Sequence, residues 1–79
     1  MKKIIVYTQP DCPPCEITKM FLTEHQIPFE VKNIKTDKRA KKELVEKYQS
    51  YSTPTIVIDN TVITGFDLDK LKHELNIES

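Results

Sequence analysis

The sequence predicts an α/β domain in which a four-stranded mixed sheet is flanked by three helices, in the order β-α-β-α-β-β-α. Apolar residues follow strand periodicity in some segments and helical periodicity in others. The opening strand–helix–strand unit implies a right-handed crossover and a parallel first pair of strands. Later, Asp59-Asn60 separates two short β-rich runs and predicts a hairpin, which adds antiparallel strands. At 79 residues the chain has the size of one domain, residues 1–79.

The first strand and the first helix are predicted from residues 2–8 and 13–25. The run KKIIVYT is apolar and β-rich, which suits a strand that is buried on both faces. The helix is expected to begin with proline, because an N–H at the first helical position has no intrahelical partner. Its apolar residues are expected to share one face, and they are Ile17, Met20 and Phe21.

The remaining elements follow from periodicity and from turn residues. Residues 29–34 (FEVKNI) alternate apolar and polar side chains, which is typical of a half-buried strand. Residues 37–49 have the pattern of an amphipathic helix, and residues 55–64 supply the two strands of the hairpin. Gly65 ends that run, and Asp67 can cap a last helix. The apolar side of this helix carries Leu68, Leu71 and Leu75.

Charge and composition argue against several classes of partner. Twelve basic and twelve acidic side chains cancel, so neither nucleic acid nor an acidic membrane is expected as the main partner. The N-terminal apolar run has four residues, whereas a secretory signal needs roughly 7–15 and a membrane span about 20. We therefore expect a cytoplasmic protein, and a monomer at this size. In a reducing compartment, neighbouring thiols are more often catalytic or metal-binding than structural.

The two cysteines of the chain, Cys12 and Cys15, stand three positions apart. A closed zinc or iron–sulfur site usually needs four ligands, and the only other soft donors are His25 and His73, far away on predicted helices. A metal or iron–sulfur binding module is therefore the disfavoured alternative, and no bound metal or cofactor is expected. A structural disulfide here would close a very short loop. The spacing beside a strand–helix–strand unit favours thiol redox chemistry.

The same spacing predicts different roles for the two thiols. Residues three apart on a helix face the same way, so both sulfurs can meet within one turn. Cys12, exposed at the helix entry, is expected to attack a substrate disulfide, and the more shielded Cys15 then attacks Cys12 and releases the reduced substrate. Pro14 has no N–H, so the Cys12 sulfur should receive one helix N–H, that of Cys15. Asp11 and Glu16 oppose a thiolate, and we expect a moderately acidic thiol that suits a reductant.

Three blocks occur in a characteristic order: YTQPDCPPC after the first strand, STPTIVID before the hairpin and TGFD before the last helix. With these blocks, nearly the whole chain resembles the glutaredoxin family within the thioredoxin fold. The resemblance implies a dithiol–disulfide oxidoreductase that acts as a small electron carrier. It also implies that Thr53-Pro54 is a cis-proline element facing the dithiol, where the Thr53 backbone can pair with an extended substrate. From the residues alone, Pro54 is an ordinary strand-entry proline, because only about 5–6% of X-Pro bonds in folded proteins are cis. The implied substrate-binding residues are Gln9, Pro13, Thr53, Pro54, Gly65, Phe66 and Asp67.

Two positions depart from typical glutathione-using glutaredoxins. Those proteins usually carry lysine where this chain has Gln9, and Gly-Gly or Gly-Cys where it has Gly65-Phe66. Both departures resemble the glutaredoxin-like redoxins that are reduced by thioredoxin reductase and that serve ribonucleotide reductase. The resemblance therefore implies these two partners, with NADPH acting only through the reductase; a glutathione-dependent glutaredoxin is the alternative. For Phe66, crowding of the substrate groove and packing under the last helix both remain open.

Overall fold

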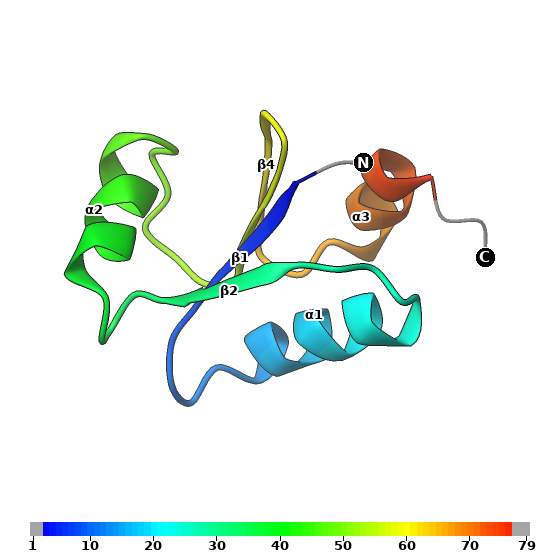
Figure 1. The fold of residues 1–79 in the computed structure, drawn as a ribbon, viewed down its shortest axis with the longest axis horizontal. Helices are drawn as coiled ribbons and strands as arrows, with labels where there is room; N and C mark the ends of the chain where they lie inside the picture. Colours follow the sequence, from blue (N-terminus) through cyan, green and yellow to red (C-terminus); the bar gives the residue numbers. More distant parts are fainter. Residues whose placement is uncertain (1–2, 77–79) are drawn as a thin grey trace.

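The computed structural model describes residues 3–76 and has the predicted order of elements (Figure 1). The elements are β1 (Ile4–Thr8), α1 (Pro13–Glu24), β2 (Glu30–Asn33), α2 (Lys38–Glu46), β3 (Thr55–Ile58), β4 (Thr61–Thr64) and α3 (Leu68–Leu75). Residues 1–2 and 77–79, including the first residue of the strand predicted at 2–8, lie outside the described residues. Within residues 3–76, no helix combines the length and the apolar character that crossing a membrane requires.

The four strands form one mixed sheet in the order β2-β1-β3-β4. β1 is parallel to β2, with Val6 opposite Val31, and antiparallel to β3, with Val6 opposite Ile56. β3 and β4 pair antiparallel, and Asp59 in the turn between them has a φ of 52°, in the left-handed region that tight hairpin turns use. The parallel first pair and the hairpin are thus confirmed.

Helices cover both faces of the sheet, with α1 and α3 on one face and α2 on the other (Figure 1). The core under α1 and α3 consists of Ile4, Val6, Leu22, Ile56, Ile58, Ile63 and Leu71. The core under α2 consists of Ile5, Tyr7, Ala40, Leu44 and Val57. Successive residues of β1 therefore enter opposite cores, as the strand period of two requires, and all of β1 is buried as predicted.

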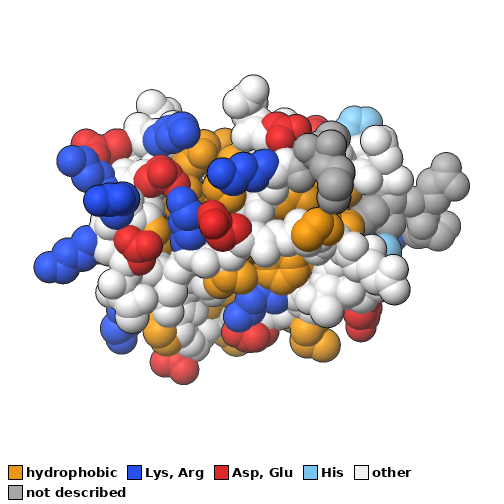
Figure 2. All heavy atoms as spheres, in the orientation of Figure 1, with side chains coloured by type: hydrophobic (Ala, Val, Ile, Leu, Met, Phe, Trp, Pro, Cys, Tyr) orange, Lys and Arg blue, Asp and Glu red, His pale blue; other side chains and the backbone are white. Residues whose placement is uncertain are grey.

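Helix α2 is amphipathic, as its sequence pattern predicts. Its N-terminus is capped by the carboxylate of Asp37, which accepts a 3.0 Å hydrogen bond from the N–H of Ala40. Ala40 and Leu44 are buried against the sheet. The outer surface is strongly basic, and Figure 2 shows lysine and arginine side chains gathered over α2, with acidic side chains among them. The exposed basic residues of this helix are Lys38, Arg39, Lys41 and Lys42.

The buried face of α1 differs from the apolar face that its sequence predicts. Ile17 and Met20 are 50% and 61% exposed, whereas Cys15, Thr18 and Leu22 are buried. Thr18 can be buried because its hydroxyl donates a 2.9 Å hydrogen bond to the carbonyl of Pro14, so no polar group is left unpaired. The helix is thus rotated to bury Cys15, and part of its apolar stripe faces outward.

A hydrogen-bonded cluster ties α2 to the sheet. The hydroxyl of the fully buried Tyr7 donates to the carboxylate of Glu43, and Lys32 Nζ donates to the same carboxylate at 3.1 Å. Burial and the hydrogen bond to Glu43 raise the pKa of Tyr7 above its usual range. The hydrogen bonds from Tyr7 and Lys32 lower the pKa of Glu43, so its carboxylate is charged in the folded protein. This cluster connects β1, β2 and α2 in one network.

Candidate active site

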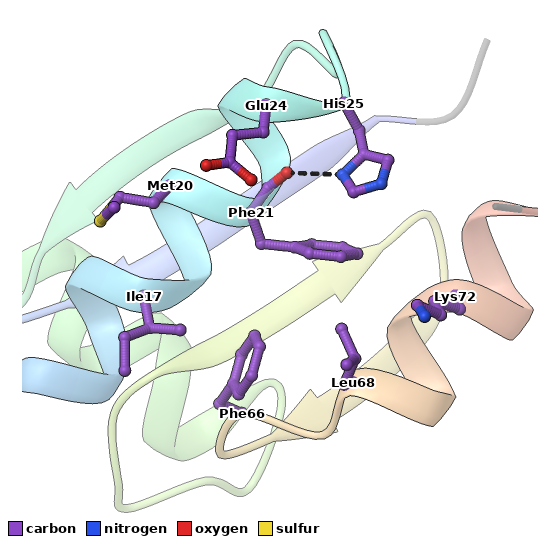
Figure 3. A pocket seen from close by; sticks show the side chains of 8 residues that line it. All are labelled: Ile17, Met20, Phe21, Glu24, His25, Phe66, Leu68 and Lys72. Atoms are coloured by element: carbon purple, nitrogen blue, oxygen red, sulfur yellow. Dashed lines mark hydrogen bonds between the residues drawn. The ribbon is translucent and has the colours of Figure 1, made fainter. Parts of the chain in front are cut away.

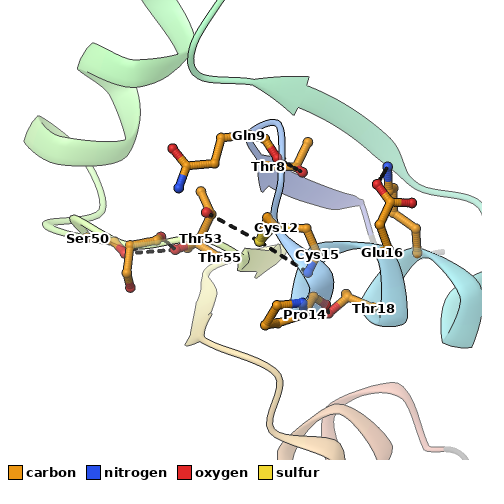
Figure 4. The surroundings of a disulfide bond; sticks show 12 residues. Thr8, Gln9, Cys12, Pro14, Cys15, Glu16, Thr18, Ser50, Thr53 and Thr55 are labelled. Carbon is orange, nitrogen blue, oxygen red and sulfur yellow. Dashed lines mark hydrogen bonds and ion pairs between the residues drawn. A yellow bond between two sulfur atoms is a disulfide. The ribbon is translucent and has the colours of Figure 1, made fainter.

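The two cysteines form a disulfide across the first turn of α1 (Figure 4). Their Cα atoms are 5.2 Å apart, and Cys12 is partly exposed while Cys15 is completely buried. Cys12 is the N-cap of the helix, in an extended conformation with φ −119° and ψ 90°. Pro13 and Pro14 follow as the first two helical residues, where a fixed φ favours the helix and a missing N–H costs little. The predicted order of exposure is therefore confirmed.

Two donors contact the Cys12 sulfur. The N–H of Cys15 donates to it at 3.3 Å, as predicted for a cap whose second helical residue is a proline. The other donor is the hydroxyl of Thr53, whose Oγ1 lies 3.6 Å from the sulfur (Figure 4). Only the backbone of Thr53 was predicted to take part, so this side-chain contact was not predicted from the sequence. Its one signal in the sequence is a hydroxyl residue directly before the proline.

The peptide bond between Thr53 and Pro54 is cis, as the family resemblance implies. The segment around it is held by buried hydroxyl groups whose role was not predicted from the sequence. Thr55 Oγ1 donates to the carbonyl of Ser52 and lies 2.7 Å from Ser50 Oγ, and both hydroxyl residues are buried. These bonds fix the short loop between α2 and β3, and thereby the position of Thr53. The run of hydroxyl residues from Ser50 to Thr55 was the available signal.

The backbone of Gly65 contacts the segment that contains the cis-proline. The N–H of Gly65 donates a 2.8 Å hydrogen bond to the carbonyl of Pro54, which sets the start of the β4–α3 connection beside the cis-proline. The Asp67 carboxylate instead caps α3 by accepting the N–H of Lys70 at 3.2 Å. Among the residues predicted to bind substrate, Gly65 is thus hydrogen-bonded to Pro54, whereas the carboxylate of Asp67 caps helix α3.

Phe66 packs against α1. Its ring meets that of Phe21 edge-on, with the centroids 6.3 Å apart, and it contacts the core under α1 and α3. It also lines an apolar groove of about 400 Å³ between α1 and α3 (Figure 3). The residues lining this groove are Ile17, Met20, Phe21, Glu24, His25, Phe66, Leu68 and Lys72. Packing under the last helix therefore describes Phe66 well, and the groove it borders shares no residue with the hollow at Cys12.

The immediate surroundings of Cys12 carry negative charge. A hollow of about 440 Å³ is lined by Asp11, Cys12, Pro13 and Glu16. Glu16 pairs with Lys19 at 2.8 Å, so part of its charge is balanced on the helix surface. Gln9 is exposed in the loop before Cys12, and Figure 4 shows its side chain directed toward the Thr53 side of the sulfur. The carboxylates of Asp11 and Glu16 disfavour a thiolate on Cys12, so the hydrogen-bond donors to its sulfur influence how readily the thiolate forms.

No cluster of three or more histidine, cysteine or acidic side chains that could hold a metal ion occurs within residues 3–76. The reactive groups that the structure shows at this site are the two cysteine sulfurs. A partly exposed sulfur at a helix N-terminus, joined to a shielded sulfur one turn away, can open and re-form a disulfide with little movement of the backbone.

Comparison with known proteins agrees with this geometry. The glutaredoxin family model matches residues 4–63. A glutaredoxin-like 8.6 kDa protein in the rubredoxin operon of Clostridium pasteurianum is 34% identical over 71 residues, covering 86% of this chain and 95% of that protein.

Solved structures give the same result. A crystal structure of a mutant of the thioredoxin-like protein BC3987 is 52% identical with a TM-score of 0.94, covering 99% of this chain and 100% of that one. The glutaredoxin-like NrdH-redoxin from Escherichia coli is 25% identical with a TM-score of 0.79, covering 90% of this chain and 92% of that one. The predicted thioredoxin-like fold is confirmed. The chain belongs to the glutaredoxin family of thiol-disulfide oxidoreductases.

Proposed function

We propose that this protein is a small dithiol–disulfide electron carrier in which Cys12 is the nucleophile and Cys15 the resolving residue. The observation that carries the proposal is the unequal exposure of two bonded sulfurs at one helix N-terminus. Only the Cys12 sulfur is open to a second molecule, whereas Cys15 is shielded and reaches Cys12 alone. The helix N-terminus favours negative charge on the exposed sulfur.

The reaction begins with the reduced protein. The Cys12 thiolate attacks one sulfur of a substrate disulfide, and the other substrate sulfur leaves as a thiolate and takes up a proton. The Cys15 thiol then loses its proton and attacks Cys12 Sγ, which breaks the mixed disulfide and releases the second substrate thiol. The substrate gains two electrons and two protons, and the protein is left with the Cys12–Cys15 disulfide.

The substrate segment is proposed to lie across residues 50–55, which we call the cis-proline loop. An extended peptide at this place can pair with the backbone of Thr53, as strands add to a sheet edge, while Pro54 supplies an apolar wall. Pro13 lines the hollow at Cys12, Gln9 is exposed in the loop before Cys12, and Gly65 is hydrogen-bonded to Pro54, so these residues are candidates for substrate contact. Phe66 and Asp67 would act less directly, through the helix that they support.

Thioredoxin reductase is the proposed reductant, with NADPH as the source of electrons through that enzyme, and a ribonucleotide reductase disulfide is the proposed client. Two observations support this proposal. Position 9 carries glutamine in place of the lysine of typical glutathione-using glutaredoxins. The chain is also similar to NrdH-redoxin, a protein with a thioredoxin-like activity profile. A glutathione-dependent glutaredoxin is the alternative. We propose that the protein works in the cytoplasm, as a monomer.

The decisive experiment compares two reductants on the oxidised protein. NADPH consumption is followed with thioredoxin reductase, and separately with glutathione and glutathione reductase. We expect rapid turnover in the first system and slow turnover in the second. Gln9→Lys should raise the rate with glutathione, whereas Gln26→Lys, at an exposed position past the other end of α1, should leave it unchanged. Preference for glutathione in the unmodified protein would reverse the choice of reductant.

The roles of the two cysteines are tested separately. Cys12→Ser should abolish the reduction of protein disulfides. Cys15→Ser should halt the reaction at a covalent mixed disulfide, which mass spectrometry detects as the summed mass of protein and substrate. A fully active Cys15→Ser variant on protein disulfides would contradict the resolving role.

A further inference from the structure

The Cys12 sulfur lacks one of the hydrogen bonds that a helix N-cap normally receives. A cap side chain accepts from the N–H groups of the second and third helical residues. Here the second residue is Pro14, which has no N–H, so the helix provides only the Cys15 N–H at 3.3 Å. The sulfur therefore has unused capacity to accept a hydrogen bond, in a hollow that is lined by the carboxylates of Asp11 and Glu16.

The hydroxyl of Thr53 occupies a position from which it can fill this gap. Its Oγ1 lies 3.6 Å from Cys12 Sγ, although the two residues are 41 positions apart in the sequence. Within residues 3–76, it is the only side chain with a hydrogen bond to this sulfur. Figure 4 shows it reaching the sulfur from the cis-proline loop, while the Cys15 N–H reaches it from the helix.

The surrounding bonds keep this hydroxyl in place. On one side, the Ser52 carbonyl accepts the Thr55 hydroxyl at 2.7 Å, and Thr55 itself is buried. On the other side, Pro54 is buried and its carbonyl accepts the N–H of Gly65 at 2.8 Å. Thr53 is half-buried and β-branched, so few side-chain rotamers are open to it. The donor is thus oriented before the sulfur becomes charged.

We propose that the Thr53 hydroxyl is a catalytic group that donates a hydrogen bond to the Cys12 thiolate and replaces the N–H missing at Pro14. The inference rests on the proposed function, because it concerns the same nucleophile. When the disulfide is reduced, the Cys12 sulfur becomes a thiolate and accepts hydrogen bonds more strongly than a disulfide sulfur does. The hydroxyl therefore stabilises the reduced protein more than the oxidised one, which raises the reduction potential.

The other charged or titratable groups near the sulfur do not stabilise its thiolate form. Asp11 and Glu16 line the hollow and oppose the thiolate, with Glu16 partly balanced by Lys19. In the cis-proline loop, the titratable side chain is that of Tyr51, which is 81% exposed. Past Gly65, the Asp67 carboxylate is engaged at the α3 N-terminus. The helix dipole and the two donors must therefore outweigh the two carboxylates of the hollow.

The test compares three substitutions in the otherwise unmodified protein. Thr53→Val keeps the shape but removes the hydroxyl, Thr53→Ala removes hydroxyl and methyl, and Thr53→Ser keeps the hydroxyl. The Cys12 pKa is taken from the pH dependence of iodoacetamide alkylation of the reduced protein, with the modified residue located by mass spectrometry. The reduction potential is taken from equilibration with a dithiothreitol buffer, and circular dichroism confirms folding.

We expect Thr53→Val and Thr53→Ala to raise the Cys12 pKa by about half to one unit and to make the reduction potential more negative. Thr53→Ser should stay close to the unmodified protein. An unchanged pKa in both hydroxyl-free variants, or an equal shift in Thr53→Ser, would overturn the inference; should one hydroxyl-free variant not fold, the other decides. The alkylation needs no reductase or client, whereas failure of the unmodified protein to reduce disulfides would count against the proposed function instead.

Discussion

The N–H of Gly65 donates a hydrogen bond to the Pro54 carbonyl at 2.8 Å, and this contact joins the end of the hairpin to the cis-proline loop. Thr53, directly before Pro54, in turn touches the Cys12 sulfur. Three segments that are distant in sequence thus meet in a chain of two hydrogen bonds. A substitution at Gly65, at Thr53 or at the N-terminus of α1 should therefore alter the effect of a substitution at either of the other two places.

Gly65→Ala should lower the free energy of unfolding by about 1–2 kcal/mol, because Gly65 has a φ of 74°, where a Cβ is unfavourable. An added Cβ would meet no atom within 4 Å, so the cost comes from the backbone and not from a clash. Gly65→Asn should cost less, since asparagine tolerates the left-handed region better. Urea unfolding measures both, and equal losses in the two variants would contradict the backbone explanation.

Pro14→Ala should lower the pKa of Cys12 by about half to one unit and raise the reduction potential, because it restores the N–H of the second helical residue. Pro13→Ala is the matched control, since the first helical N–H is not one that the cap side chain accepts. The pH dependence of iodoacetamide alkylation measures both. The same shift in the two variants, or none in Pro14→Ala, would rule out the missing donor as the cause.

Leu22→Ala should lower the free energy of unfolding by about 2–5 kcal/mol, whereas Met20→Ala should change it by no more than about 0.5 kcal/mol. The reason is burial, because Leu22 is completely buried and Met20 is 61% exposed on the same helix. Urea unfolding of the two variants tests which face of α1 contacts the sheet. If Met20→Ala lowered the free energy of unfolding as much as Leu22→Ala, the face of α1 that contacts the sheet would be the one that the apolar pattern indicates.

Acid should destabilise the protein partly through Glu43. Hydrogen bonds from Tyr7 and Lys32 hold the folded-state pKa of Glu43 below its ordinary value of 4.5. A lowered folded-state pKa contributes stability that is present above pH 4.5 and is lost as the pH falls through the folded-state pKa. In Glu43→Gln, the free energy of unfolding should therefore decrease less steeply as the pH falls below 4.5.

The control for this effect is Glu46→Gln on the same helix. Glu46 forms an exposed pair with Lys42 at 3.9 Å, and such surface pairs contribute little. Urea unfolding at neutral pH and at several acidic pH values should show the flattened profile in Glu43→Gln alone. A profile of Glu43→Gln that runs parallel to that of the unmodified protein would show that the Tyr7 and Lys32 contacts do not stabilise the charged form.

Local chemistry explains why much of the fold could be predicted from the sequence. The order of the elements, the two prolines after Cys12 and the cap at Asp67 follow from signals between neighbouring residues, and the structure agrees with each. The alternation predicted for residues 29–34 is not seen, because Val31 is 45% exposed in β2. The same locality explains the unequal exposure of Cys12 and Cys15, since their positions in the first turn of a helix determine it.

The parts that could not be predicted depend on contacts between distant residues. The apolar pattern of α1 indicates a stripe through Ile17 and Met20, but the neighbouring stripe with Cys15 and Leu22 is buried, because the sheet and α3 decide which side is covered. The Thr53 hydroxyl meets Cys12 only after the α2–β3 loop is in place. Hydrophobic periodicity reports on neighbouring residues and cannot predict a contact between residues 41 positions apart.

The position of β1 has a consequence for the motions of the domain. This strand is paired on both edges and buried along its length, and the loop that leads to Cys12 leaves from its end. Its amide protons should exchange with solvent only through global opening, whereas the exposed sulfur reacts in the closed state. The loop that precedes Cys12 is thus anchored on a strand that should exchange slowly, and we expect a redox cycle to require no opening of the sheet.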